Sequence, residues 1–398
     1  MRSLLAIAIG IVVPIAAAAQ SLSQFERPKA PALAPKLACR DLRSLSGFEF
    51  SIDTATTLGE SCVVQGLIQP EVRFEVGLPA SWNGRLYMIG NGGYAGESLA
   101  VPGRVARRDA ALAKGFAWAQ TNTGHDGARE PLASFASSPQ KLADYAYRAV
   151  HVTALVAKQL ARAYYGTPAT RSYFDGCSTG GRQGLISAQR FPDDFDGIVV
   201  GAPVLDFTGT MSHYVKIHQA LAATPKLGEK LPQLAEKIYA KCDAVDGLAD
   251  GQIEDPRRCK FDPASELAGW TTEELKVLDA VYGGVGSFPG FPVGAEALAP
   301  RSGWEPWFVA RPDSNQPAIQ VSFAETFFKH MVTPGKEIAH ALLPGQSTKR
   351  NSALQKTLWQ RAAQASSSRV PPDFGNCARK RRAASVSRGE GARPSARR

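Results

Sequence analysis

The chain has 398 residues, of which 44% are hydrophobic, so it can bury a sizeable core and form two or three domains. Its formal net charge of +10 comes from one end, because residues 331–398 hold fourteen of the 46 Lys and Arg residues but only three of the 36 acidic residues. The rest of the chain is nearly neutral, and from Ala378 on no aromatic residue is interleaved with the basic residues, which argues against a nucleic-acid partner.

The first nineteen residues have the pattern of a secretory signal. Arg2 precedes an apolar run at residues 4–15, and the alanines that follow suit cleavage after Ala19. The run is too short to span a bilayer, and no later stretch of about eighteen apolar residues occurs, so we expect no membrane partner. The sequence therefore predicts an exported protein, secreted or periplasmic, in which disulfides can form.

Periodicity places the next elements in order along the chain. Short strands are expected in residues 20–75, and residues 85–90 and 115–120 are typical of core strands. Residues 138–165 have the spacing of one long amphipathic helix.

The sequence Gly176-Cys-Ser-Thr-Gly180 places Ser178 in a Gly-x-Ser-x-Gly pattern directly after a strand-like run at residues 171–175. An apolar-faced helix follows and stops near Pro192, and residues 197–201 read as the next buried parallel strand. This strand-turn-helix-strand unit predicts a nucleophile elbow. Ser178 would be the nucleophile, and the backbone amide of Thr179 would face a developing oxyanion.

These motifs together resemble the tannase and feruloyl esterase family of α/β-hydrolases. The resemblance stops near Phe328. It implies an α/β-hydrolase core in residues 20–204 with an inserted lid domain in residues 205–331, a fold left incomplete at the C-terminus by a basic, disordered or out-of-frame tail in residues 332–398. The segments that carry the resemblance are residues 78–85, 90–96, 121–125, 144–148, 173–184 and 191–203.

The resemblance implies hydrolysis of small aromatic acid esters through an acyl-enzyme. The second oxyanion donor is expected in the loop after the strand ending near residue 90, with Gly93 preferred, Gly92 the alternative donor and a simple tight turn the other interpretation. His125 precedes Ser178, whereas an α/β-hydrolase runs serine, acid, histidine. We therefore expect His125 to have a structural role, hydrogen-bonded near the pocket.

The second half of the triad is missing from the expected place. The family supplies an acid and a His-Cys pair after the lid, but none of His213, His218, His330 and His340 precedes a cysteine. The simplest interpretation is a shift of reading frame near residue 332, which would leave the esterase impaired. The alternative function is a noncatalytic, calcium-stabilised secreted binding protein. The oligomeric state is not readable from the sequence.

The cysteines and an acidic loop bear on stability rather than chemistry. The resemblance implies disulfides Cys39–Cys62 and Cys242–Cys259. It would also pair Cys177 with a cysteine beside the triad histidine, but Cys377 is followed by Ala378, so a free thiol is favoured. Between the second pair, three carboxylates and two carbonyls suit a structural Ca²⁺, with a solvated acidic turn as the alternative. The resemblance to the family's lid calcium site favours calcium. Its expected ligands are Asp243, Asp246, Leu248, Asp250 and Gln252.

An aromatic cluster near the end of the lid is a candidate substrate wall. It comprises Trp304, Trp307 and Phe308. Core packing is the more common role of such a cluster, so these residues are pocket candidates only.

Overall fold

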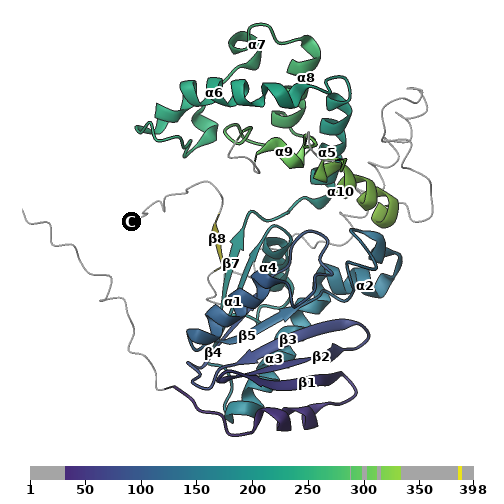
Figure 1. Cartoon of the computed structure of the whole chain (residues 1–398), viewed down its shortest axis with the longest axis vertical. Helices are drawn as coiled ribbons and strands as arrows, with labels where there is room; N and C mark the ends of the chain where they lie inside the picture. Colours follow the sequence, from purple (N-terminus) through teal and green to yellow (C-terminus); the bar gives the residue numbers. More distant parts are fainter. Residues whose placement is uncertain (1–31, 287, 298–302, 312–314, 333–383, 388–398) are drawn as a thin grey trace, which may run out of the picture. The chain divides into compact units, whose positions relative to one another are not determined.

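The computed structural model describes residues 32–286, 288–297, 303–311, 315–332 and 384–387. It contains a mixed sheet of eight strands in the order β1-β2-β3-β5-β4-β6-β7-β8 (Figure 1). Pairing is antiparallel from β1 to β5 and parallel from β5 to β8. The strands are β1 (Phe50–Leu58), β2 (Ser61–Ile68), β3 (Val72–Leu78), β4 (Arg85–Ile89), β5 (Ala117–Thr121), β6 (Arg171–Cys177), β7 (Gly197–Gly201) and β8 (Ala384–Ser387).

The central strands show why the sequence forms a parallel sheet. Strands covered on both faces are buried along their length, and all five residues of β5 are buried. Strand β4 buries Leu86, Met88 and Ile89. The predicted core strands at residues 85–90 and 115–120 are therefore confirmed.

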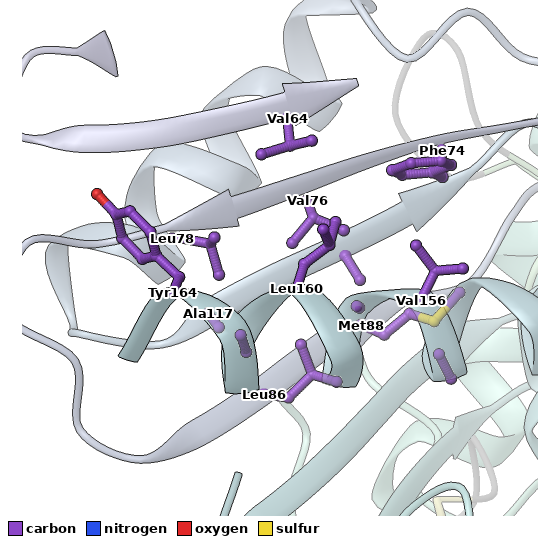
Figure 2. Close-up of a cluster of buried hydrophobic side chains, with 14 of the residues drawn as sticks. Val64, Phe74, Val76, Leu78, Leu86, Met88, Ala117, Val156, Leu160 and Tyr164 are labelled. Carbon is purple, nitrogen blue, oxygen red and sulfur yellow. The ribbon is translucent and has the colours of Figure 1, made fainter. Parts of the chain in front are cut away.

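Four helices accompany these strands: α1 (Pro102–Ala113), α2 (Pro139–Ala143), α3 (Ala149–Tyr165) and α4 (Thr179–Arg190). The helix predicted at residues 138–165 is confirmed as α2 and α3, joined by a π-helical turn at Asp144–Arg148. Figure 2 shows Val156, Leu160 and Tyr164 of α3 packed against apolar side chains of the sheet. This i, i+4 spacing buries one face of the helix.

The chain after β7 is helical and has an apolar cluster of its own. The cluster includes Ile217, Leu234, Val277 and Trp304 and shares no buried residue with the cluster under the sheet. These helices are α5 (Phe207–Leu221), α6 (Leu231–Cys242), α7 (Pro263–Glu266), α8 (Thr272–Tyr282), α9 (Trp304–Trp307) and α10 (Ile319–Phe327).

The expectation of a disordered tail differs from the structure at one place. Residues Ala384–Ser387 form β8, which pairs in parallel with β7. The backbone of β7 would otherwise present unpaired N–H and C=O groups at a sheet edge, and a further strand satisfies them. The rest of the tail and the expected signal at residues 1–19 lie outside the described residues. Within the described part, no helix combines the length and apolar character that crossing a membrane requires.

Candidate active site

Ser178 is the residue between the end of β6 and the start of α4. Its backbone has φ 59° and ψ −118°, a positive φ that a non-glycine residue rarely adopts. Such a conformation costs on the order of 1–3 kcal/mol and persists where the surroundings enforce it. The residue is exposed, while the following Thr179 is buried. The predicted strand-turn-helix geometry is therefore present around Ser178.

Glycines allow the backbones around Ser178 to touch. A Cβ added to Gly176 would lie 2.3 Å from the carbonyl oxygen of Gly180. A Cβ added to Gly90 would lie 2.6 Å from the Cα of Gly180. The end of β4 and the first turn of α4 are thus in backbone contact, which brings the loop after β4 beside the serine.

Two side chains hold this loop through the carbonyl of Gly93. The Tyr145 hydroxyl donates to the Gly93 oxygen at 3.0 Å, and the Thr179 hydroxyl donates to the same oxygen. The two residues proposed as oxyanion donors, Thr179 and Gly93, are therefore in direct contact. Gly93 has φ 47°, which suits glycine.

The amides of the loop differ in their partners. The Asn91 amide donates to the Gln183 side-chain oxygen at 3.0 Å, and the Gly92 amide donates to a Glu97 carboxylate oxygen at 3.3 Å. Within the described residues, the Gly93 amide has no hydrogen-bond acceptor. This difference favours Gly93 over the alternative donor, Gly92.

No histidine of the described residues is hydrogen-bonded to Ser178. His125 is buried and stacks on Phe135 with ring centroids 4.0 Å apart. The backbones of Thr123 and Tyr94 approach the His125 ring, but within the described residues neither ring nitrogen makes a contact with full hydrogen-bond geometry, so the hydrogen bond expected there stays a prediction. The structural role expected for His125 accords with its burial.

The histidines after Ser178 lie in the helical part of the chain after β7 or in the residues that follow it. His213 is buried, and its Nε2 lies 2.6 Å from the carbonyl oxygen of Ala280. His218 lies near the end of α5, and His330 lies in the π-helical turn after α10. His340 is outside the described residues. The structure therefore supplies no triad histidine in the described part of the chain.

Burial of three histidines leads to a prediction on acid stability. Burial lowers the pKa of His125, His213 and His218. The unfolded chain then binds more protons than the folded one below about pH 6.5, so the free energy of unfolding should fall as the pH drops from 7.5 to 5.5. Burial also raises the pKa of Asp194 and Glu296, which acts in the opposite direction.

Comparison with His213→Gln isolates the histidine effect. In urea unfolding at pH 7.5 and 5.5, the free energy of unfolding of this variant should fall by on the order of 1 kcal/mol less than that of the parent protein. An equal loss in the two proteins would contradict the prediction for His213.

One histidine pair escaped the sequence analysis. His151 on α3 has its Nδ1 2.8 Å from a carboxylate oxygen of Asp194, and its ring stacks on Phe191. These residues join α3 to the segment that follows α4. His151 precedes Ser178 in the chain and Asp194 follows it, whereas an α/β-hydrolase triad runs serine, acid, histidine. The one sequence signal near this pair is Pro192, which predicts the end of the preceding helix.

The aromatic pocket candidates lie in different surroundings. Trp304 and Phe308 are buried in the apolar cluster of the helices after β7, where Phe308 also packs on Phe291. Core packing accounts for these two residues. Trp307 is 44% exposed, so it remains the candidate of the three for contact with a substrate.

Two other aromatic residues, Tyr94 and Phe323, lie at the loop after β4, residues 90–96, which we call the oxyanion loop. The Tyr94 hydroxyl donates to the Phe323 carbonyl at 3.1 Å, and their rings are 4.7 Å apart. A Cβ on Gly93 would lie 3.3 Å from the ring of Phe323. Phe323 is on α10, so a helix of the expected lid contacts the loop after β4. Sequence spacing gave no signal for this contact, which joins residues far apart in the chain.

Both predicted disulfides are confirmed. Cys39 bonds Cys62, and Cys242 bonds Cys259. Cys177 is a free, exposed thiol. Its possible partner Cys377 lies outside the described residues.

The acidic loop between the second pair of cysteines is held by its own backbone amides. Asp243 accepts from the Gly251 amide at 3.1 Å, and Asp246 accepts from the Glu254 amide at 3.2 Å. Asp250 accepts from the Gln252 amide at 3.1 Å. The described residues contain no group of three or more His, Cys, Asp or Glu side chains arranged to hold a metal ion. The loop nevertheless keeps the donor chemistry of a calcium site, because each carboxylate has about four acceptor positions.

Comparison with known proteins identifies relatives of the chain. A family model described as tannase and feruloyl esterase matches residues 55–341. A probable feruloyl esterase B-2 of Aspergillus flavus is 38% identical over 199 residues, which cover 48% of this chain and 36% of that protein. An uncharacterized esterase of Xanthomonas campestris pv. campestris is 33% identical over 306 residues, covering 69% and 51%. The mono(2-hydroxyethyl) terephthalate hydrolase of Piscinibacter sakaiensis is 34% identical over 245 residues, covering 53% and 41%. The matched part thus spans between about a third and a half of these relatives.

A solved structure gives the fold. Feruloyl esterase B from Aspergillus oryzae superimposes with a TM-score of 0.64 and 22% identity, covering 88% of this chain and 74% of that one. At this identity the likeness concerns the fold alone. The predicted α/β-hydrolase fold class is confirmed.

Proposed function

This chain belongs to the tannase and feruloyl esterase family, and from that premise we propose a serine carboxylic ester hydrolase that acts on esters of aromatic acids. The observation that carries the proposal is the backbone of Ser178, at φ 59° between a parallel strand and a helix. Relatives named for feruloyl and terephthalate esters support an aromatic acyl group.

The geometry supports acyl transfer in two stages. The Ser178 oxygen attacks the ester carbonyl carbon, and the charge on the carbonyl oxygen is taken up by the amides of Thr179 and Gly93. The carbon–oxygen bond to the alcohol breaks, the alcohol leaves with a proton, and water then hydrolyses the acyl-enzyme. Both stages need a base within hydrogen-bond reach of Ser178 and a carboxylate that orients this base.

We propose that the chain as written is impaired in this reaction. The support is that no histidine of the described residues is hydrogen-bonded to Ser178 and that none of the later histidines precedes a cysteine. The alternative of a noncatalytic binding protein draws on the same observation. Equilibrium dialysis with an aromatic acid ester separates the two, since a binding protein retains the ester unchanged at micromolar concentration. Ester turnover after completion of the triad tests the esterase.

We propose export of the protein, secreted or periplasmic. The two disulfides support this compartment, because such bonds persist in oxidising surroundings. A small aromatic ester would be the partner.

We also propose that the loop from Asp243 to Gln252 binds one structural Ca²⁺. Its ligands would be the carboxylates of Asp243, Asp246 and Asp250 and the carbonyls of Leu248 and Gln252. The Cys242–Cys259 disulfide closes the loop and supports a fixed arrangement. Backbone hydrogen bonds lower the pKa of Asp246, which favours its ionised form.

Removal of calcium should lower the melting temperature. A ligand that binds the folded state alone stabilises it by about 2.7 kcal/mol at one hundred times its Kd. Calorimetry in excess Ca²⁺ and in chelator should show a shift that Asp243→Asn reduces. Glu60→Gln, which removes a carboxylate from the turn between β1 and β2, should keep the full shift. A melting temperature indifferent to chelator, with no metal in the purified protein, would remove the claim.

A further inference from the structure

Glu97 holds the first part of the oxyanion loop. One of its carboxylate oxygens accepts the Gly92 amide at 3.3 Å, and the other accepts the Asn91 side-chain amide at 3.0 Å. The Arg104 guanidinium donates to the same carboxylate and also approaches the Gly90 carbonyl oxygen at 3.4 Å. Glu97 and Arg104 therefore bind three consecutive residues of this loop, Gly90, Asn91 and Gly92.

The contacts continue from Arg104 into the sheet. Arg104 donates to the Gln120 side-chain oxygen at 3.1 Å, and Gln120 donates to Glu75 at 2.8 Å. Arg108 donates to the other oxygen of Glu75 at 3.3 Å. Glu75 on β3 and Gln120 on β5 are buried, as is Arg104 on α1. We name this set of side chains, from Glu75 through Gln120 and Arg104 to Glu97, the charged network.

Such a network is a costly way to stabilise a fold. Desolvation of buried ions consumes most of their mutual attraction, and apolar replacements of similar volume are often as stable. What a satisfied network does provide is one fixed geometry, because each member has a single arrangement that meets all its hydrogen bonds. Here the fixed geometry ends at the Gly92 amide, one residue before Gly93.

We propose that Glu97, held by Arg104, is a positioning residue for the Gly93 oxyanion donor. The inference rests on the proposed ester hydrolase. The Glu97 carboxylate accepts from the Gly92 amide, which fixes the peptide unit before the one that carries the Gly93 N–H. The hydroxyls of Thr179 and Tyr145 donate to the Gly93 carbonyl oxygen, which fixes the peptide unit after it. Loss of the Glu97 charge would free one side of the peptide that carries the Gly93 N–H and move the donor.

The test uses a nucleophile that needs no histidine. In the full chain with Ser178→Cys, Cys177→Ala and Cys377→Ala, a thiolate forms at pH 8 without a base. A p-nitrophenyl aromatic ester acylates it: the sulfur bonds to the carbonyl carbon, the oxygen gains negative charge, and p-nitrophenolate leaves. Iodoacetamide alkylates the same sulfur at a CH₂ carbon with loss of iodide and forms no oxyanion. The ratio of the two rates therefore measures oxyanion stabilisation at constant thiol access.

Glu97→Gln should lower this ratio about 100-fold, because a small misplacement of one donor costs about that much. The glutamine NH₂ would face the donors of Asn91 and Arg104, so the loop has to shift. Glu97→Ala should lower the ratio at least as far. The matched control is Glu296→Gln in the lid, which also removes a carboxylate that accepts a backbone amide, here Gly294 at 3.0 Å. It should leave the ratio unchanged.

The outcomes separate this inference from the proposed function. A parent protein whose ratio equals that of a small free thiol has no oxyanion hole, which overturns both. A parent with a raised ratio that Glu97→Gln and Glu97→Ala leave intact overturns the positioning role alone. If the Glu97 variants fail to fold by circular dichroism, Arg104→Lys decides. It keeps the charge but loses the forked contacts with Gln120 and Gly90, and a ratio lowered about tenfold supports the proposal, whereas an unchanged ratio overturns it.

Discussion

Completion of the triad is expected to raise hydrolysis of methyl ferulate by about a million-fold over the chain as written. The completed protein would carry one of the two alternative reading frames of its gene after residue 331, which we expect to encode an aspartate followed by a His-Cys pair. The reason is that Ser178 already has the strained turn of an elbow and two proposed oxyanion donors beside it, but an unactivated hydroxyl is a poor nucleophile near neutral pH. Release of ferulic acid, followed by chromatography, measures both rates.

Ser178→Ala in each protein is the control. It should abolish the activity of the completed protein and leave the low rate of the present chain unchanged. Turnover by the present chain at an enzyme-like rate, lost in Ser178→Ala, would mean that His213, His218, His330 or His340 acts as the base. The frame-shift interpretation would then be wrong. A completed protein that stays inactive would overturn the esterase assignment.

Gly176→Ala should destabilise the protein by about 3 kcal/mol and remove whatever reactivity Ser178 has. The added Cβ would lie 2.3 Å from the Gly180 carbonyl oxygen, a distance that no rotamer relieves because both atoms belong to the backbone or are fixed to it. The strand and helix of the elbow must therefore separate. Urea unfolding measures the loss, and the thiol acylation assay, with Gly176→Ala added to the Ser178→Cys protein, measures the effect at the site.

Gly103→Ala provides the matched substitution. No atom lies within 4 Å of a Cβ added there, at the start of α1. Alanine in a helix is more favourable than glycine by roughly 0.5–1 kcal/mol, so this variant should be as stable as the parent or more so. Equal stability of the two alanine variants would show that the elbow tolerates a wider turn than the structure describes.

Local patterns were sufficient to predict the elbow and the central sheet. The Gly-x-Ser-x-Gly turn, the helix after it and the strand at residues 197–201 follow each other without interruption, so their geometry depends on neighbouring residues alone. The helix at residues 138–165 was also predictable, since its apolar face repeats with the helical period. The π-helical turn inside it was not, because a single inserted residue leaves that period almost intact.

The surroundings of the site depend on contacts that spacing does not reveal. Tyr145 reaches Gly93 across 52 residues, and Tyr94 reaches Phe323 across 229. Trp304 and Phe308 show the same limit, since an aromatic cluster has one sequence pattern whether it lines a pocket or fills a core. Glu97 and Arg104 carry no recognisable motif. Their role appears only when the partners of each loop amide are compared.

The Thr179 side chain links the two proposed oxyanion donors to each other. The backbone amide of Thr179 is one of the two proposed donors, and its hydroxyl donates to the carbonyl oxygen of Gly93, 86 positions away in the chain. A displacement of the first turn of α4 therefore carries the Gly93 loop with it. We therefore expect motions that spread or twist the strands to change the spacing of the two proposed donors less than they change other distances across the sheet. The spacing of the Thr179 and Gly93 amides would then stay nearly constant while the sheet that carries them deforms.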